Sequence, residues 1–215
     1  MKIDFVSDVS CPWCIIGLKS LEQALERLPE LKAELHFQPF ELNPKMGPEG
    51  QDIEEHLAQK YGASAAQTQA SRENIRQRGE ALGFHFDMGA RSRIYNTFDA
   101  HRLLHWAGTI GAAQQRALKL ALFDAYFSRG LDPSDHAVLV SMATEAGLDA
   151  AEARAVLDDA KAYASDVREA EAFWQQNGIN SVPAIIINDR HLIQGGQPPE
   201  VFERALRQHA EQESA

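Results

Sequence analysis

The sequence contains only two cysteines among its 215 residues. Its hydrophobic content of 44% is enough for a buried core, so disulfide bridges are not needed for stability. Clusters of Lys and Arg are also lacking, and the formal net charge is −10. Because affinity for nucleic acid comes largely from cations that contact phosphates, we expect no nucleic-acid partner.

The N-terminus lacks the features of a signal peptide. Asp4 and Asp8 interrupt its apolar residues, which leaves neither a signal-peptide core nor a stretch long enough to span a membrane. We therefore expect a soluble, cytoplasmic protein with no membrane partner. In a reducing compartment, a lone cysteine pair is more often catalytic, redox-sensing or metal-binding than a permanent bridge.

The two cysteines lie in a predicted β-α-β unit. Ile3 and Phe5 alternate with polar residues as in a short strand, and leucines then recur at helical spacing until Pro29. A second strand is predicted at residues 35–38. The Cys-x-x-Cys spacing therefore falls at the first strand-to-helix turn, where it is typical of a thioredoxin-like redox motif.

The middle of the chain is predicted to be almost wholly helical, and strands return only near the end. Helices are expected at residues 53–61, 65–82, 96–107, 112–128, 134–146, 149–160 and 163–176. A β-hairpin is expected at 184–193, followed by a helix at 198–209. The fold class is thus α/β: a thioredoxin fold (1–45 and 165–215) with a large, all-helical insertion (46–164).

Cys11 and Cys14 have the arrangement that disulfide exchange requires. A cysteine at a helix N-terminus forms a thiolate more easily, and this placement brings its pKa to about 7 or below. Pro12 suits the first helical turn, where its missing N–H would have no partner. Cys14 lies one turn further, where it can attack a mixed disulfide on Cys11 and release the product. Cys11 is the predicted nucleophile and Cys14 the predicted resolving thiol.

Trp13, between the cysteines, carries no titratable group. Any lowering of the Cys11 pKa is therefore expected to come mainly from the helix terminus. Its indole either provides an apolar lip for a peptide or aromatic substrate or simply covers the top of the sheet.

A second signal is the Val182-Pro183 pair just before the Ile-rich strand. Proline cannot donate a hydrogen bond within a sheet, so a proline at a strand start requires a reason. One reason is a cis bond that exposes the Val182 backbone beside the cysteines, where an extended substrate could pair with it. The alternative is an ordinary trans proline at a strand end.

Four segments together resemble the DsbA family, in its cytoplasmic FrnE-like branch: Ser10–Cys14, Pro39–Pro44, Asn96–Leu103 and Ser181–Ala184. The resemblance runs over essentially the whole chain. It implies a thioredoxin fold with a helical insertion, thiol-disulfide oxidoreductase activity on protein or small-molecule thiols and disulfides, and Pro183 as a cis proline. It also implies that no organic cofactor is needed, with glutathione as a conceivable co-substrate.

The same superfamily includes glutathione-binding kappa-class transferases and 2-hydroxychromene-2-carboxylate isomerases, which this chain resembles in architecture. In those proteins a serine stands at the position of Cys11, and the region before the proline is Gly-rich. The presence of Cys11, Cys14 and Val182 departs from that pattern. A glutathione-dependent isomerase or transferase acting on an aromatic small molecule is therefore the alternative function.

A zinc-binding or redox-sensing module is the second alternative. Cys11 and Cys14, with His101 and His105 one helical turn apart, supply the ligand types of a Cys₂His₂ site. The two pairs lie 86 residues apart in the sequence, whereas short zinc modules hold them much closer. We therefore predict no metal.

Two further residues of the resembling helix are candidate substrate contacts. Asn96 and His101 either contact substrate or hold Cys11, or they are packing residues between the helix and the sheet. His105 is interpreted as a packing residue. Asp4 on the first strand could accept a proton from Cys14, but we expect a solvated edge residue there.

Overall fold

The computed structural model describes residues 1–213, so the last two residues of the predicted thioredoxin segment lie outside it. Its main sheet has four strands in the order β2-β1-β5-β6. Strands β1 and β2 are parallel, and the other two pairs are antiparallel. The strands are β1 (Lys2–Ser7), β2 (Glu34–Pro39), β5 (Ala184–Ile187) and β6 (His191–Gln194).

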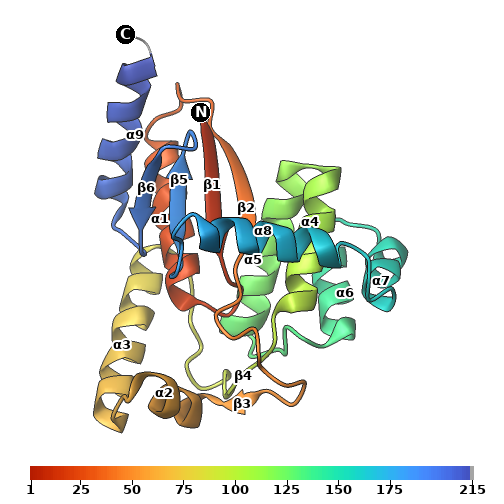
Figure 1. Cartoon of the computed structure of the whole chain (residues 1–215). Helices are drawn as coiled ribbons and strands as arrows, with labels where there is room; N and C mark the ends of the chain where they lie inside the picture. Colours follow the sequence, from red (N-terminus) through yellow and green to blue (C-terminus); the bar gives the residue numbers. More distant parts are fainter. Residues whose placement is uncertain (214–215) are drawn as a thin grey trace.

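Helices cover both faces of this sheet (Figure 1). Because side chains alternate along a strand, Ile3 and Phe5 of β1 face the core that contains α1 (Pro12–Glu26) and α9 (Pro199–Glu213). Val6 faces the other way and packs in a cluster with Trp174 of α8 (Ala164–Gln176). Together with the insertion below, this confirms the predicted thioredoxin fold with a helical insertion.

The insertion contributes six helices among the described residues. They are α2 (Ile53–Tyr61), α3 (Ala65–Ala81), α4 (Phe98–Ile110), α5 (Ala112–Phe127), α6 (His136–Glu145) and α7 (Ala150–Asp158). Helices α4 to α7 form a second apolar cluster, which Val9 from the turn before Cys11 also joins. Ile75 of α3 and Phe123 of α5 instead join the core beneath the sheet. The insertion is therefore packed directly against the thioredoxin fold.

Helix α5 also closes one edge of the sheet. The side chain of Gln115 accepts a hydrogen bond from the Phe37 backbone N–H at 3.1 Å and donates to the Phe37 carbonyl at 3.2 Å. It thereby supplies the groups that a neighbouring strand would offer to β2. This contact brings the buried face of α5 close to the strand ends from which the cysteines emerge.

Two sequence expectations about the middle of the chain need correction. The segment is not purely helical, because β3 (Gln51–Asp52) and β4 (Arg93–Ile94) pair as an antiparallel ribbon. Strands of two residues are too short to show an alternating pattern. Helix α4 begins at Phe98 instead of residue 96, because Asn96 Oδ1 accepts the Phe98 N–H at 2.9 Å and stands outside the helix.

The expectation that Asp4 is a solvated edge residue was wrong. Strand β1 lies between β2 and β5, so Asp4 is 0% exposed. Its carboxylate accepts a hydrogen bond from Gln38 at 2.6 Å and pairs with the Lys2 ammonium at 2.9 Å. These partners hold the carboxylate at the centre of the sheet.

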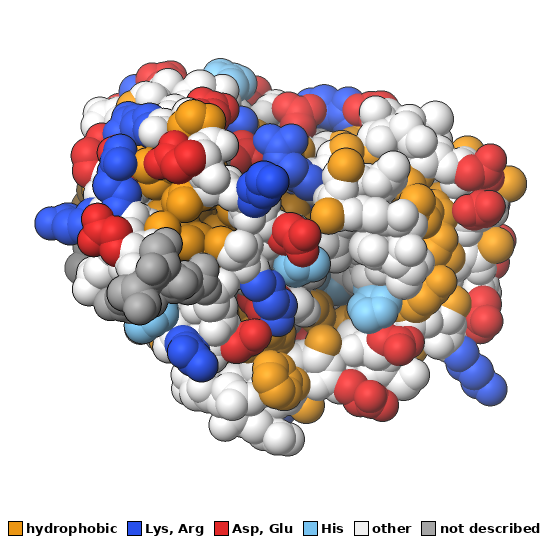
Figure 2. All heavy atoms as spheres, turned by 90° about the horizontal axis from the view of Figure 1, so that it is seen from above, with side chains coloured by type: hydrophobic (Ala, Val, Ile, Leu, Met, Phe, Trp, Pro, Cys, Tyr) orange, Lys and Arg blue, Asp and Glu red, His pale blue; other side chains and the backbone are white. Residues whose placement is uncertain are grey.

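The surface carries charges of both signs. On the face shown in Figure 2, Lys and Arg side chains are interspersed with Asp and Glu. Within residues 1–213, none of the helices combines the length and apolar character needed to cross a bilayer.

Candidate active site

The two cysteines lie at the start of α1, where the chain leaves β1. Cys11 precedes the helix with an extended backbone (φ −92°, ψ 113°), and Pro12 occupies the first helical turn. Cys14 follows on the helix, and its N–H donates to the Cys11 carbonyl at 3.0 Å. Both cysteines are free thiols in this structure. Cys11 thus stands where the unpaired N–H groups of a helix favour a negative charge.

Both cysteines are almost completely buried. Cys11 exposes 4% of its surface and Cys14 exposes 0%. Both belong to the core cluster, against which the partly buried Trp13 and Val182 pack. The small exposed part of Cys11 is therefore the part of the pair that a substrate in solution reaches first.

The Val182-Pro183 segment lies directly beside Cys11. The Val182–Pro183 peptide bond is cis. The Cys11 thiol donates to the Val182 carbonyl, with 3.7 Å between sulfur and oxygen. Helix α1 approaches the proline closely at Gly17, where an added Cβ would meet Pro183 Cγ at 3.0 Å. The glycine therefore allows the helix and the proline segment to meet next to the thiols.

The protonation of Cys14 is controlled by its surroundings. Burial raises the pKa of the Cys14 thiol well above its ordinary value, and the interaction with Cys11 raises it further. The charge of Lys119, a residue of α5, acts in the opposite direction. Lys119 is itself fully buried, and this burial lowers its pKa to about 8.

Asp8 organises the turn that precedes Cys11. Its backbone carbonyl accepts the Cys11 N–H at 3.2 Å, and its carboxylate accepts the N–H groups of Ser10 at 3.0 Å and Leu42 at 2.7 Å. His101 Nε2 lies 3.7 Å from Asp8 Oδ1, which is an ion-pair distance. Burial acts to raise the pKa of Asp8, but His101 and the two backbone N–H groups outweigh it, so the pKa is lowered. His101 therefore reaches the cysteine turn through Asp8.

Trp13 is held from two sides. The guanidinium of Arg78, on α3, lies 5.3 Å from the centre of its ring and donates to the Gly196 carbonyl at 3.0 Å. A Cβ added at Gly196 would meet the Trp13 carbonyl oxygen at 3.0 Å. The insertion thus reaches across to the residue between the two cysteines.

The fold agrees with comparisons to known proteins. The chain matches the DSBA-like thioredoxin domain over residues 2–207. It is 36% identical to a probable DsbA oxidoreductase from Streptomyces coelicolor, with a TM-score of 0.90 over 97% of this chain and 89% of that chain. The chain belongs to the DsbA-like thioredoxin family.

Two proteins of lower sequence identity are also similar to this DsbA-like chain. It is 26% identical over 207 residues to the uncharacterized protein YwbO of Bacillus subtilis (strain 168), covering 96% of each. A 2-hydroxychromene-2-carboxylate isomerase shares its fold at 14% identity and a TM-score of 0.71, over 100% of this chain and 98% of that chain.

The structure gives Asn96 and His105 partners other than the cysteines. Asn96 donates to the Met46 carbonyl at 3.2 Å and accepts the Phe98 N–H at 2.9 Å, so it joins the segment before β3 to the start of α4. The His105 ring packs 5.5 Å from that of Tyr163. Among residues 1–213, no group of three or more His, Cys, Asp and Glu side chains is placed to hold a metal ion.

Sequence reasoning missed three residues around the cysteines: Asp8, Arg78 and Lys119. Asp8 was noted only as an interruption of the N-terminal apolar run. Arg78 and Lys119 lie on helices of the insertion, 67 or more positions from Cys11 in the sequence. One local signal could have indicated that Lys119 is buried. This lysine lies between apolar residues of a predicted helix, in the run Ala117-Leu118-Lys119-Leu120-Ala121.

Proposed function

We propose that this protein is a thiol-disulfide oxidoreductase that exchanges disulfides through Cys11 and Cys14. The single observation that supports it most directly is the position of the Cys11 sulfur, at the start of α1 and 3.7 Å from the Val182 carbonyl. The likeness to a probable DsbA oxidoreductase supports the same activity. Protein or small-molecule disulfides are the proposed substrates.

The exchange proceeds in two balanced steps. The Cys11 thiolate attacks one sulfur of the substrate disulfide, which forms a mixed disulfide and releases the first substrate thiolate. Cys14 then gives up its proton and attacks Cys11, which forms the Cys11–Cys14 disulfide and releases the second thiolate. The substrate gains two electrons and the cysteine pair loses two. In the opposite direction, the same steps form a substrate disulfide.

The residues around Cys11 provide the proposed substrate contacts. Pro12, Trp13 and Val182 are all partly exposed next to the thiol. The Val182 backbone offers hydrogen bonds to an extended peptide, as in strand addition. His101 is proposed to act on this surface through Asp8, and Asn96 stays a predicted contact.

Cysteine replacements test the proposal directly. In the Cys14→Ser variant, long-lived mixed disulfides between Cys11 and disulfide-containing protein substrates should accumulate, because the resolving thiol is absent. Cys11→Ser should trap none and should lose insulin-disulfide reduction. The double Cys11→Ser/Cys14→Ser variant is the matched blank, because the chain has no other cysteine. Full activity of Cys11→Ser would refute the proposal.

The same variants separate the proposal from the glutathione-dependent alternative. An isomerase or transferase of that kind needs no resolving thiol, so Cys14→Ser would keep full turnover of an aromatic substrate. Calorimetric titration with glutathione would then show saturable binding that does not depend on Cys14. A thiol-disulfide oxidoreductase instead loses turnover when Cys14 is replaced.

A further inference from the structure

Arg78 is an exposed cation of α3 that no carboxylate within residues 1–213 neutralises. Its guanidinium makes one hydrogen bond, to the Gly196 carbonyl at 3.0 Å, and lies over the Trp13 ring, 5.3 Å from the ring centre. The other two arginines of this helix differ, because Arg72 and Arg76 each pair with glutamate side chains. Arg78 is therefore the arginine of α3 whose charge is left for a partner outside the chain.

The contacts of Arg78 hold it where the segments around the thiols meet. Trp13 separates the two cysteines in the sequence. Gly196 belongs to a turn that is tied to the cis-proline segment, because the Gly195 N–H donates to the Pro183 carbonyl at 2.8 Å. Figure 1 shows α3 at the end of the sheet where α1 begins. Arg78 thus contacts both the cysteine turn and the turn beside the cis proline.

The Arg78 guanidinium keeps donors for a ligand. It carries five N–H groups in one plane, and the Gly196 carbonyl accepts from only one of its nitrogens. Contact with an aromatic ring uses the face of a guanidinium, which leaves the donors at its edges available. Two parallel N–H donors match the two oxygens of a carboxylate. An exposed arginine held over Trp13 is therefore preorganised to bind a carboxylate that arrives from solvent.

A substrate joined to Cys11 is long enough to bring a carboxylate to this position. In a mixed disulfide, the Cα atoms of the two bonded cysteines lie about 5.5–6 Å apart. The next Cα of the substrate chain lies about 3.8 Å further, and its side chain extends beyond that. Trp13 is only two positions from Cys11. An acidic residue next to the substrate cysteine can therefore cross the indole and meet the guanidinium.

We propose that Arg78 selects substrates in which an acidic residue adjoins the reacting cysteine. This inference rests on the proposed function and names a substrate class for the same site. The Arg78 guanidinium donates to the substrate carboxylate while Cys11 exchanges with the substrate disulfide. The chain as a whole carries a net charge of −10, which disfavours acidic partners at long range, so their recognition depends on this local cation.

Three symmetrical peptide disulfides test this selection. Each is formed from an N-acetylated, C-amidated tripeptide that has its cysteine between two Glu, two Gln or two Lys residues. Acid quenching followed by reversed-phase chromatography gives the rate constant for reduction of each disulfide by the reduced protein, and for oxidation of each peptide thiol by the oxidised protein. The Gln peptide records any general effect of a substitution on Trp13 or the thiols. The readout is therefore the ratio of the Glu-peptide to the Gln-peptide rate constant.

Two variants of Arg78 should change this ratio. Arg78→Met should lower it about fivefold at low ionic strength, because a charge-assisted pair with the substrate is lost. Added salt should reduce this difference between the two proteins. Arg78→Glu should lower the ratio further and raise the Lys-to-Gln ratio, because the charge is reversed. A residue that only supports the Trp13 ring would alter all three peptides alike.

Arg76→Met is the matched control. It removes a cation from the same helix, but one that already pairs with Glu73 and Glu80. The Glu-to-Gln ratio of this variant should stay within about twofold of that of the unmodified protein. Circular dichroism verifies that each variant is folded.

The outcomes separate this inference from the proposed function. A Glu-to-Gln ratio that is unchanged in both Arg78→Met and Arg78→Glu would overturn the inference, while turnover of the peptides still supports the function. An equal fall of the ratio in Arg76→Met would also overturn it, because the effect would not depend on the position over Trp13. If the unmodified protein neither reduces the peptide disulfides nor oxidises the peptide thiols, the proposed function is refuted instead.

Discussion

Arg102 and Lys119 are both buried cations of the helical insertion, with 2% and 1% of their surfaces exposed. Their surroundings differ sharply. Arg102 donates to the carbonyls of Ala162 at 2.8 Å and Val156 at 2.6 Å, and also to the Asp159 carbonyl. Its remaining nitrogen donates to Asp99 at 2.7 Å. Lys119, by contrast, has no acceptor among the described residues.

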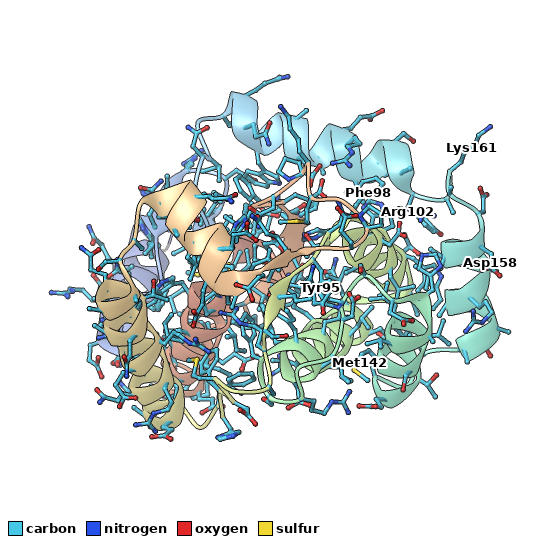
Figure 3. The ribbon with its side chains drawn as sticks, turned by 90° about the horizontal axis from the view of Figure 1, so that it is seen from below. Tyr95, Phe98, Arg102, Met142, Asp158 and Lys161 are labelled. Atoms are coloured by element: carbon cyan, nitrogen blue, oxygen red, sulfur yellow. The ribbon has the colours of Figure 1, made fainter. Side chains whose placement is uncertain are left out.

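The position of Arg102 explains its partners. Figure 3 shows Arg102 on α4, with Asp158 and Lys161 at the end of α7 and in the turn that follows. The planar guanidinium of Arg102 donates hydrogen bonds to backbone carbonyls at and just after the end of α7, where helical N–H donors run out. Asp99 accepts from Arg102 and lies 2.7 Å from His136 of α6, which extends the network to a third helix. Arg102 thereby ties α4, α6 and the α7–α8 connection together.

Arg102 and Lys119 show that the hydrogen-bond partners of a buried cation determine its role. A cation whose N–H groups all have acceptors stays charged and fixes the positions of the elements around it. A cation without acceptors is easily deprotonated, and it costs stability while it remains charged. Arg102, of the first kind, binds carbonyls and a carboxylate of neighbouring elements, whereas Lys119, of the second kind, acts electrostatically on the thiols. Three substitutions test this comparison.

Replacement of Arg102 should have the largest effect on stability. Arg102→Met removes the guanidinium donor from the Val156, Asp159 and Ala162 carbonyls and from one oxygen of the Asp99 carboxylate, so the free energy of unfolding should fall by about 3–5 kcal/mol. Urea denaturation followed by circular dichroism measures it. Arg207→Met is the control: among residues 1–213 the exposed Arg207 side chain pairs only with Glu203, so its replacement should cost less than about 1 kcal/mol. An equally small loss of unfolding free energy for Arg102→Met would contradict the stabilising role of the Arg102 network.

Replacement of Lys119 should have the opposite sign at neutral pH. The pKa of Lys119 is about 8 in the folded chain against 10.5 for an exposed lysine, so the unfolded chain binds more protons between these values. The stability of the unmodified protein therefore gains as pH rises through this window, whereas Lys119→Met lacks that gain. At pH 7 the variant should be more stable, and its advantage should shrink by about 3 kcal/mol between pH 7 and 11.

Paired urea titrations of the two proteins across this range measure the difference directly. Taking the difference removes the titration of groups that do not interact with Lys119, such as Tyr126. A constant difference across the window would contradict the lowered pKa of Lys119.

Arg78 should give the smallest effect, because it is a cation at the surface. Arg78→Ala removes the contact with the Trp13 ring and the hydrogen bond to Gly196, and should cost about 0.5–1 kcal/mol. Arg76→Ala, on the same helix, loses only exposed pairs with Glu73 and Glu80 and should cost about 0.5 kcal/mol or less. Urea midpoints compare the two. A larger loss for Arg76 would show that the Trp13 contact adds nothing.

Much of the fold could be predicted from local patterns. The capping residues Asp52 and Ser64 and the glycine Gly62 define the ends of α2 and α3 where helices were expected, because a cap acts on its own turn. The ribbon of β3 and β4 could not be predicted, because each strand forms only through pairing with a segment about 40 positions away. The turn and helix that carry Cys11 and Cys14 were predictable because their signals are local.

The burial of charged residues was not predictable in the same way. Asp4 was expected in solvent and lies at the centre of the sheet, since the strand order depends on which segments pair. Asp8 is close to Cys11 in the sequence, but its burial beside His101 depends on the packing of the insertion. Lys119 comes from a distant helix, and only that packing places it where it acts electrostatically on the cysteines.

The sequence by itself determined the pair of thiols, their spacing at a strand-to-helix turn and the helical character of the insertion, because each depends on residues within a few turns of one another. The tertiary structure decided how exposed Cys11 is and which charges surround Cys14. Burial and electrostatic interaction depend on groups that the chain brings together only when α5 and α8 pack against the sheet.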